Sequence, residues 1–286
     1  MTAMVTPFDS EGKLHLDGAR ELAAWLVEQG SEGLVVCGST GEGPTVTDEE
    51  KITLWREVKD ATGSRASVIA NTGTYDTAHS IHLTQEAESA GADAALVVTP
   101  YYNRPPQTGL LAHFKAIASA TSLPIILYDI PVRTGRKIEH ATLLELAGVR
   151  NIAGVKDACG DVQGVARLVA EAPGDFSVWC GNDADTLPWL SVGAVGVIAV
   201  ASHVAGPQMA EMISAFKSGD PETARKIHLS LMPVFDVLGI TTNPIPVKAA
   251  LGLLGKPSGD PRLPLPPATK DEVDQIRGVL KDSGFL

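Results

Sequence analysis

The sequence has no apolar run long enough to cross a membrane as a helix. Its longest nearly continuous apolar stretch runs from Val192 to Ala201 and has ten residues, two of them glycines, whereas a spanning helix needs about 20. No signal peptide is expected before Val5-Thr6-Pro7. The sequence therefore predicts a protein without a membrane partner.

Positive charge and cysteine are also scarce. Lys and Arg number 23 against 34 Asp and Glu, which gives a net charge of −11. No cluster of basic residues can neutralise successive phosphates, so nucleic acid is not expected as a partner. The three cysteines, Cys37, Cys159 and Cys180, stand at or just beyond apolar segments. We interpret them as reduced thiols of a cytoplasmic protein.

The 286 residues are 44% apolar and 20% charged, which excludes intrinsic disorder and is enough for a large core. Eight short stretches are rich in Val, Ile and Leu without polar alternation, the pattern of parallel strands covered on both faces. They are Ala3 to Thr6, Gly33 to Val36, Ser67 to Ala70, Ala94 to Val98, Ile125 to Tyr128, Ile152 to Lys156, Phe176 to Cys180 and Gly196 to Val200. Met1 lies almost directly before the first of them, which is compatible with a longer natural amino terminus.

Amphipathic segments lie between these strands. In one, Thr47 to Ala61, the residues Thr47 and Glu50 have capping-box spacing. The others are Leu16 to Gln29, Asp76 to Ala90, Leu110 to Ala120, Ala141 to Ala147, Val162 to Ala170, Thr186 to Val192 and Gln208 to Lys217. Eight such βα repeats predict a (β/α)8 TIM barrel over residues 1–219. Segments at Pro221 to Leu238, Pro244 to Leu254 and Thr269 to Leu280 predict a C-terminal helical appendage over residues 220–286.

Barrel enzymes build their active sites just after the carboxyl ends of the strands, and the sixth strand ends in Lys156. The residues before it, Ile152-Ala153-Gly154-Val155, are small or apolar. Desolvation disfavours a charged amine and leaves the neutral nucleophile that forms a Schiff base with a carbonyl substrate. The alternative is a lysine that extends from the strand end into solvent.

Hydroxyl groups follow three other strands. Ser39 and Thr40 come after the second, Tyr102 after the fourth, and Tyr128 ends the fifth. If they converge on one rim, these groups can pass protons between substrate and solvent. Taken singly, each has an ordinary alternative, a tyrosine at a core edge or a turn hydroxyl.

Arg133 follows the fifth strand in a Pro-x-Arg-Thr-Gly loop, where a guanidinium can hold a carboxylate through two hydrogen bonds. The alternative is a solvated surface arginine. Because the net charge repels anions at long range, an anionic substrate needs the local positive charge of Arg133 and Lys156. No metal site is expected, since His79 and His82 have the spacing of ligands but no evident third partner.

These residues resemble motifs of the dihydrodipicolinate synthase/N-acetylneuraminate lyase family, and the likeness extends over essentially the whole chain. Gly38-Ser39-Thr40-Gly41-Glu42 is similar to the G-x-x-G-E loop of the family. Tyr128 and Lys156, the latter within Gly154-Val155-Lys156-Asp157, resemble its catalytic tyrosine and imine-forming lysine. The segment Asn243 to Lys248 resembles the tail motif of the synthase branch, as does the position of Arg133.

The resemblance implies a lyase that condenses pyruvate with L-aspartate 4-semialdehyde in lysine and diaminopimelate biosynthesis. It implies an imine at Lys156 and proton transfers by Tyr128, which is linked through Ser39 to Tyr102 of a neighbouring subunit. Thr40 would then bind the pyruvate carboxylate and Arg133 the semialdehyde carboxylate. The backbone near Gly181 and Ile198 would line the pocket. No metal or organic cofactor is implied, and the usual assembly of the family is a homotetramer, a dimer of dimers.

The sequence departs from the family pattern at three places. Ser39 stands where threonine is usual and lacks the methyl group that restrains χ1. Asp129 replaces the common asparagine and adds a negative charge next to Tyr128. At the positions of the lysine-inhibition pocket stand Lys51 or Asp48 and His79, so we expect inhibition by lysine to be weak or absent.

Two other functions remain open. One is a different pyruvate-dependent class I aldolase or lyase of the same family, acting on sialate or on a keto-deoxy sugar acid. The other is a catalytically silent relative, which the presence of Lys156, Tyr128, Tyr102 and Arg133 disfavours.

Overall fold

The computed structural model describes residues 1–286 and contains eight parallel strands in one sheet, ordered β1 to β8. The strands are β1 (Thr2–Ala3), β2 (Gly33–Val36), β3 (Ser67–Asn71), β4 (Ala94–Val98), β5 (Ile125–Asp129), β6 (Ile152–Asp157), β7 (Ser177–Cys180) and β8 (Gly196–Val197). Just beyond β8, the Ala199 carbonyl accepts a 2.8 Å hydrogen bond from the Ala3 amide of β1. The predicted (β/α)8 barrel is confirmed.

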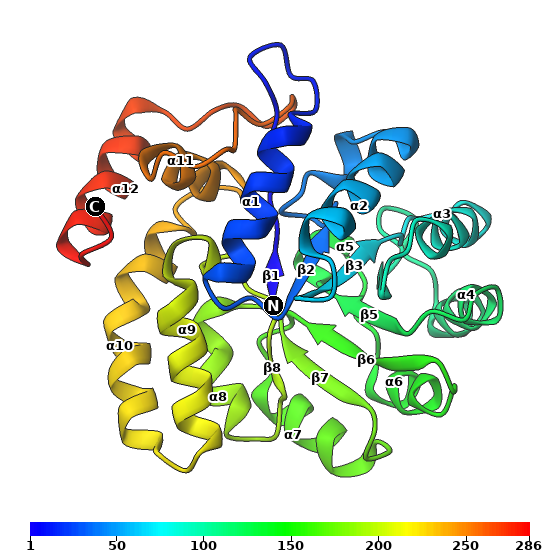
Figure 1. Cartoon of the computed structure of the whole chain (residues 1–286). Coiled ribbons are helices and arrows are strands. Elements are labelled where there is room, and N and C mark those ends of the chain that lie inside the picture. The colour runs from blue at the N-terminus through cyan, green and yellow to red at the C-terminus, as the bar shows by residue number, and fades with distance from the viewer. The chain divides into compact units, whose positions relative to one another are not determined.

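Helices follow the strands, and a C-terminal helical part follows the barrel (Figure 1). They are α1 (Leu16–Glu28), α2 (Asp48–Thr62), α3 (Thr77–Ser89), α4 (Gln107–Ser119), α5 (Pro131–Thr134), α6 (His140–Ala147), α7 (Val162–Glu171), α8 (Thr186–Leu190), α9 (Ser202–Lys217), α10 (Pro221–Val237), α11 (Ile245–Leu253) and α12 (Lys270–Asp282). The capping box predicted at Thr47 and Glu50 starts α2, with both of its reciprocal hydrogen bonds formed.

Two helices start several residues earlier than predicted, and one short helix was not predicted, each for a local reason. Helix α4 begins at Gln107, because Pro106 precedes a polar first turn that the apolar pattern did not reveal. Helix α9 begins at Ser202 and kinks at Ala205, ahead of Pro207, whereas the predicted helix began only after this proline, at Gln208. The four-residue helix α5, which carries Arg133, was not predicted at all, since it is too short to show periodicity.

Packing divides the chain into two compact units. The terminal unit comprises Met1–Ser67 and Ala199–Leu286, and the central unit comprises Val68–Ile198. In the terminal unit, α10 lies alongside α9 (Figure 1). The division into residues 1–219 and 220–286 stays a prediction.

In the central unit the strands are almost entirely buried, as their apolar sequences require. Every residue of β5 is buried, and the helices α3, α4, α6 and α7 lie outside the strands that they follow (Figure 1). Parallel pairing aligns Tyr128 of β5 with Lys156 of β6. The register of the sheet thus fixes two predicted site residues next to each other.

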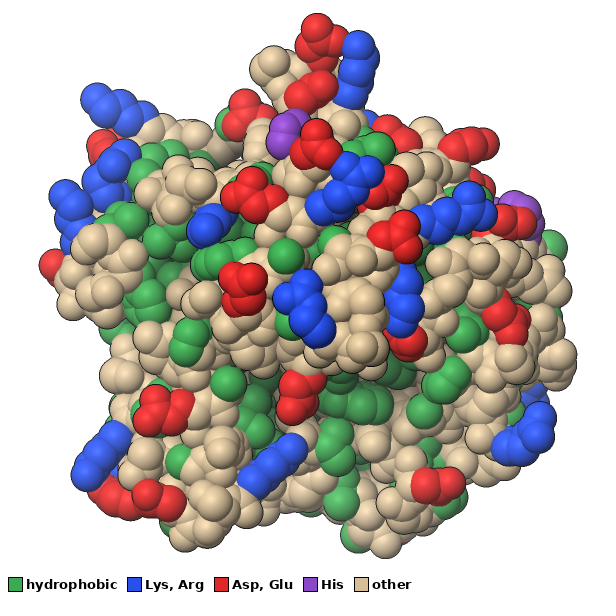
Figure 2. Space-filling view, viewed as in Figure 1, with side chains coloured by type: hydrophobic (Ala, Val, Ile, Leu, Met, Phe, Trp, Pro, Cys, Tyr) green, Lys and Arg blue, Asp and Glu red, His purple; other side chains and the backbone are tan.

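The surface carries charges of both signs. On the face drawn in Figure 2, acidic and basic side chains are interspersed, with no continuous basic stripe. None of the helices has the length and apolar character that crossing a bilayer requires. All three cysteines are free thiols.

Candidate active site

Lys156 and Tyr128 lie next to each other in the central unit. The Lys156 Nζ lies 4.4 Å from the centroid of the Tyr128 ring, and the two residues are only 5% and 4% exposed. Lys156 has no carboxylate partner among the ion pairs of the structure. The alternative of a lysine extended into solvent is therefore wrong. A desolvated lysine amine is the kind of group that can form a Schiff base with a carbonyl compound.

The next residue on each of these two strands is a buried carboxylate. Because side chains alternate along a strand, Asp129 and Asp157 point away from the amine and the phenol. Asp129 Oδ2 accepts hydrogen bonds from the Ile138 amide at 3.1 Å and from Cys159 Sγ at 3.3 Å. Burial, and next the charge of Asp157, raise the pKa of Asp129 to about 7. The charge added by Asp129 is thus directed toward the loop after β5.

Arg133 lies exposed on α5, in the loop after β5. The turn that follows it is fixed from both ends: Thr134 Oγ1 donates to Arg136 O at 2.9 Å, and Arg104 Nε donates to Gly135 O at 2.9 Å. In return, Arg136 Nη2 donates to Arg104 O at 3.1 Å. Arg104 therefore joins the Arg133 loop to the loop after β4.

Tyr102, in that loop after β4, is 93% exposed and has a φ of 71°. Its neighbours are held in place, since Tyr101 packs edge-on against Tyr75 at 5.3 Å and Asn103 Nδ2 donates to Tyr75 O at 2.9 Å. The structure does not bring Tyr102 together with Tyr128, which is buried. Within a single chain the Tyr102 side chain projects into solvent.

Gly181 borders the end of β6 through its backbone, and Ile198 borders the end of β7. The Gly181 amide donates to Asp157 O at 2.7 Å, and the Ile198 amide donates to Cys180 O at 3.0 Å. A Cβ added at Gly181 would lie 2.7 Å from Ala158 Cβ and 2.9 Å from Asp157 O. Only glycine fits at this position, directly after β7 and beside the strand of Lys156.

Ser39 and Thr40 belong to the terminal unit, in the loop after β2. This loop is tightly wound: Cys37 and Glu42 have φ values of 59° and 54°, and a Cβ added at Gly43 would lie 2.2 Å from Cys37 O. Ser39 is half-buried, and Thr40 is 3% exposed. Thr40 Oγ1 accepts a hydrogen bond from Asn243 Nδ2 at 2.9 Å.

A buried charge network holds this loop against the C-terminal segment. Glu42 Oε1 lies 2.6 Å from Lys248 Nζ, and each side chain is only 2% exposed. Glu42 Oε2 accepts from the Arg262 amide at 2.8 Å. The Arg262 guanidinium binds both oxygens of Glu50 at 2.6 and 2.7 Å and thereby lowers the pKa of Glu50.

No local sequence pattern predicts a role for Lys248, Arg262 or Asn243. The Asn243 to Lys248 segment is recognisable from the sequence only as a motif. Asn243 and Thr40 are 203 positions apart and Arg262 and Glu42 are 220 apart, so no local pattern connects them. Correlated substitution among relatives is the signal that would reveal such pairs.

Comparison with known proteins places these features in a family. The family model described as the dihydrodipicolinate synthetase family matches residues 1–283. The 4-hydroxy-tetrahydrodipicolinate synthase of Moorella thermoacetica is 56% identical over 286 residues, which cover 100% of this chain and 98% of the relative.

Comparison with solved structures points to the same family. The dihydrodipicolinate synthase of Cyanidioschyzon merolae with lysine bound has a TM-score of 0.98 at 43% identity, covering 100% of this chain and 97% of that one. The synthase of Thermotoga maritima has a TM-score of 0.97 at 42% identity, covering 100% and 98%. The chain, as its motifs predicted, belongs to the dihydrodipicolinate synthetase family.

Proposed function

We propose that the protein is a 4-hydroxy-tetrahydrodipicolinate synthase, a lyase that condenses pyruvate with L-aspartate 4-semialdehyde. The observation that carries this proposal is the buried amine of Lys156 beside the Tyr128 phenol, in a chain whose full-length relatives at about 50% identity bear that name. The pathway would be lysine and diaminopimelate biosynthesis.

The chemistry starts at Lys156. Its side-chain amine attacks the pyruvate carbonyl, and loss of water gives an imine. The imine loses a methyl proton to become an enamine, whose carbon attacks the aldehyde carbon of the semialdehyde and forms the new C–C bond. The amino group of the semialdehyde then displaces Lys156 at the imine carbon, which closes the ring and frees the enzyme.

The other residues supply protons and anion binding. Tyr128 is proposed to transfer protons with the Ser39 hydroxyl and a Tyr102 phenol, Thr40 to bind the pyruvate carboxylate, and Arg133 the semialdehyde carboxylate. The backbone near Gly181 and Ile198 is proposed to line the pocket. The 2.7 Å hydrogen bond from the Gly181 amide to Asp157 O supports the assignment of Gly181, because it places this backbone directly beside the strand of Lys156.

We propose a homotetramer in the cytoplasm as the working form. The 93% exposure of Tyr102, on a loop that its neighbours hold in a defined conformation, supports a tyrosine contributed to another subunit. Three free thiols are consistent with a reducing compartment.

Borohydride reduction in the presence of pyruvate, followed by peptide mass mapping, tests the imine. We expect the added mass on Lys156 in the wild-type protein and on no residue in Lys156→Ala. A coupled assay tests the second substrate: pyruvate should be consumed only when aspartate semialdehyde is present. Cleavage of sialate or 2-keto-3-deoxygluconate would instead identify a different lyase, and unmodified Lys156 would identify a silent relative.

A further inference from the structure

The Thr40 hydroxyl makes a single hydrogen bond within the protein, and Asn243 is the donor. Asn243 Nδ2 lies 2.9 Å from Thr40 Oγ1, and Thr40 is buried. A hydroxyl has one proton to donate and two lone pairs to accept with. Because the amide uses a lone pair of Thr40 Oγ1, the proton of Thr40 remains available to an acceptor that the protein does not supply.

A second tether prevents the Thr40 loop from moving away from Asn243. Asn243 lies just before α11 and Lys248 lies in the first turn of that helix, and their partners Thr40 and Glu42 are two positions apart in the loop. The C-terminal segment therefore binds the loop at two neighbouring points.

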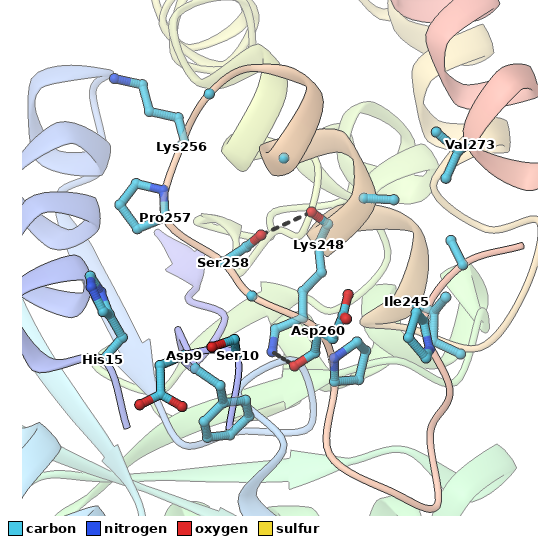
Figure 3. A pocket seen from close by; sticks show the side chains of 18 of the residues that line it. Asp9, Ser10, His15, Ile245, Lys248, Lys256, Pro257, Ser258, Asp260 and Val273 are labelled. Atoms are coloured by element: carbon cyan, nitrogen blue, oxygen red, sulfur yellow. Dashed lines mark hydrogen bonds between the residues drawn. The ribbon is translucent and has the colours of Figure 1, made fainter. Parts of the chain in front are cut away.

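Lys248 is itself held in place, as Figure 3 shows. Its Nζ donates to Asp260 O at 3.3 Å, and its carbonyl accepts from Ser258 Oγ at 3.1 Å. The ammonium also lies 4.3 Å from the centroid of the Phe8 ring. With Lys248 fixed on both sides, the distance between Asn243 and Thr40 is set by the fold and needs no ligand.

We propose that Asn243 is a positioning residue, which directs the Thr40 O–H toward the carboxylate of the keto-acid substrate. The proposal rests on the proposed function, in which Thr40 binds pyruvate. The direction of the hydrogen bond between residue 243 and Thr40 decides whether the Thr40 proton is available to the substrate. An amide N–H at position 243 forces Thr40 to accept and leaves its proton for the anion, whereas an acceptor at position 243 would take that proton for itself.

Asn243→Asp is the sharpest test, because it replaces the donor with an acceptor of the same shape. We expect the KM for pyruvate to rise about tenfold or more, the loss expected for a hydrogen bond to a charged group, while kcat changes less than about threefold. Asn243→Ala removes the donor without adding an acceptor and should raise the KM less. The KM for aspartate semialdehyde should stay within about twofold in both variants.

A double-mutant cycle shows whether the effect passes through Thr40. Thr40→Val alone should raise the pyruvate KM, and adding Asn243→Asp to it should change that KM no further. If Asn243→Asp does not fold, the same cycle is run with Asn243→Ala. As a matched control, Asn151→Ala removes an amide that donates to Ala118 O at 2.9 Å far along the chain from these residues. It should lower the melting temperature but not the affinity for pyruvate.

Two results would overturn the inference. One is an unchanged pyruvate KM in Asn243→Asp, which would mean that the carbonyl of Asn243 faces Thr40. The other is a pyruvate KM effect of equal size in the presence and absence of the Thr40 hydroxyl. Failure of the proposed function looks different, since the wild-type protein itself would then form no borohydride-trapped adduct with pyruvate.

Discussion

The two units of the molecule position their chemical groups by different means. In the central unit, Tyr128 and Lys156 stand opposite each other because the backbone register of β5 and β6 puts them there. In the terminal unit, Thr40 lies in an irregular loop that the side chains of Asn243 and Lys248, about 200 positions away, hold in place. A geometry set by a sheet tolerates the loss of a neighbouring side chain, whereas a geometry set by a buried ion pair depends on each partner.

Each unit has a buried histidine that responds to acid, and the central unit also has a buried carboxyl group that responds near neutral pH. In the terminal unit, His203 Nε2 accepts from the Val5 amide at 3.2 Å, and burial lowers the pKa of His203 to about 4. In the central unit, burial raises the pKa of Asp129 to about 7. Burial likewise lowers the pKa of His113 in the central unit to about 4. Acid therefore destabilises both units, through His203 and His113, whereas alkali destabilises the central unit through Asp129.

The largest expected effect comes from removing the proposed nucleophile of the central unit, Lys156. Lys156→Ala should lower kcat/KM at least about a thousandfold, because no other amine can form the imine. Lys115→Ala is a matched control: Lys115 is on the outer helix α4 and pairs with the exposed Glu145, so its loss should leave the rate unchanged. A Lys156→Ala enzyme that retains a tenth of its activity would contradict the assignment.

The next effect is on stability and concerns the terminal unit. Lys248→Met leaves Glu42 buried without its ammonium partner and should cost about 3 to 5 kcal/mol of unfolding free energy, the usual result of breaking a buried pair. Urea denaturation measures it. Adding Glu42→Gln should restore much of the loss, because the buried charge is then gone. A cost below about 1 kcal/mol would show that the loop does not depend on this pair.

Asp129 offers a pH-dependent effect confined to the central unit. Its pKa is raised from 3.8 to about 7 in the folded protein, so its stabilising contribution is complete below 3.8 and is lost as the pH rises through about 7. Because an asparagine side chain cannot ionise, Asp129→Asn should flatten the stability profile between these values. At pH 8 the variant should be more stable by up to about 4 kcal/mol.

Thermal or urea unfolding from about pH 4 to pH 8 measures this profile. Cys159 Sγ and the Ile138 amide, both hydrogen-bonded to Asp129 Oδ2, can still donate to the amide oxygen of the variant. Parallel profiles for the two proteins would mean that Asp129 is ionised throughout this range.

The same contrast explains what the sequence could predict. The strands, the barrel and the Lys156–Tyr128 pair follow from local apolar patterns and from the rule that parallel strands carry the site at their carboxyl ends. The partners of Thr40 and Glu42 do not follow from local patterns, because these contacts join residues far apart in the chain. Helix α5 was missed for a different reason, because four residues starting at Pro131 show no period.

The smallest expected effect is that of lysine. Lys51 in α2 is 8% exposed, and its Nζ lies 3.3 Å from Asp48 Oδ1. The carboxylate of Asp48 is therefore already paired with the ammonium of Lys51. A free lysine would bring a second ammonium to the same carboxylate, and like charges repel. We therefore expect sub-millimolar L-lysine to leave the rate unchanged, although the Cyanidioschyzon merolae relative binds lysine. Initial rates measured across a lysine titration test this expectation, and half-inhibition below about a millimolar, an ordinary affinity for a small ligand, would contradict it.

The substitution Lys51→Glu should have the opposite effect on lysine binding. It removes the ammonium partner of Asp48 and adds a second carboxylate, so it should make the enzyme more sensitive to lysine than the wild type.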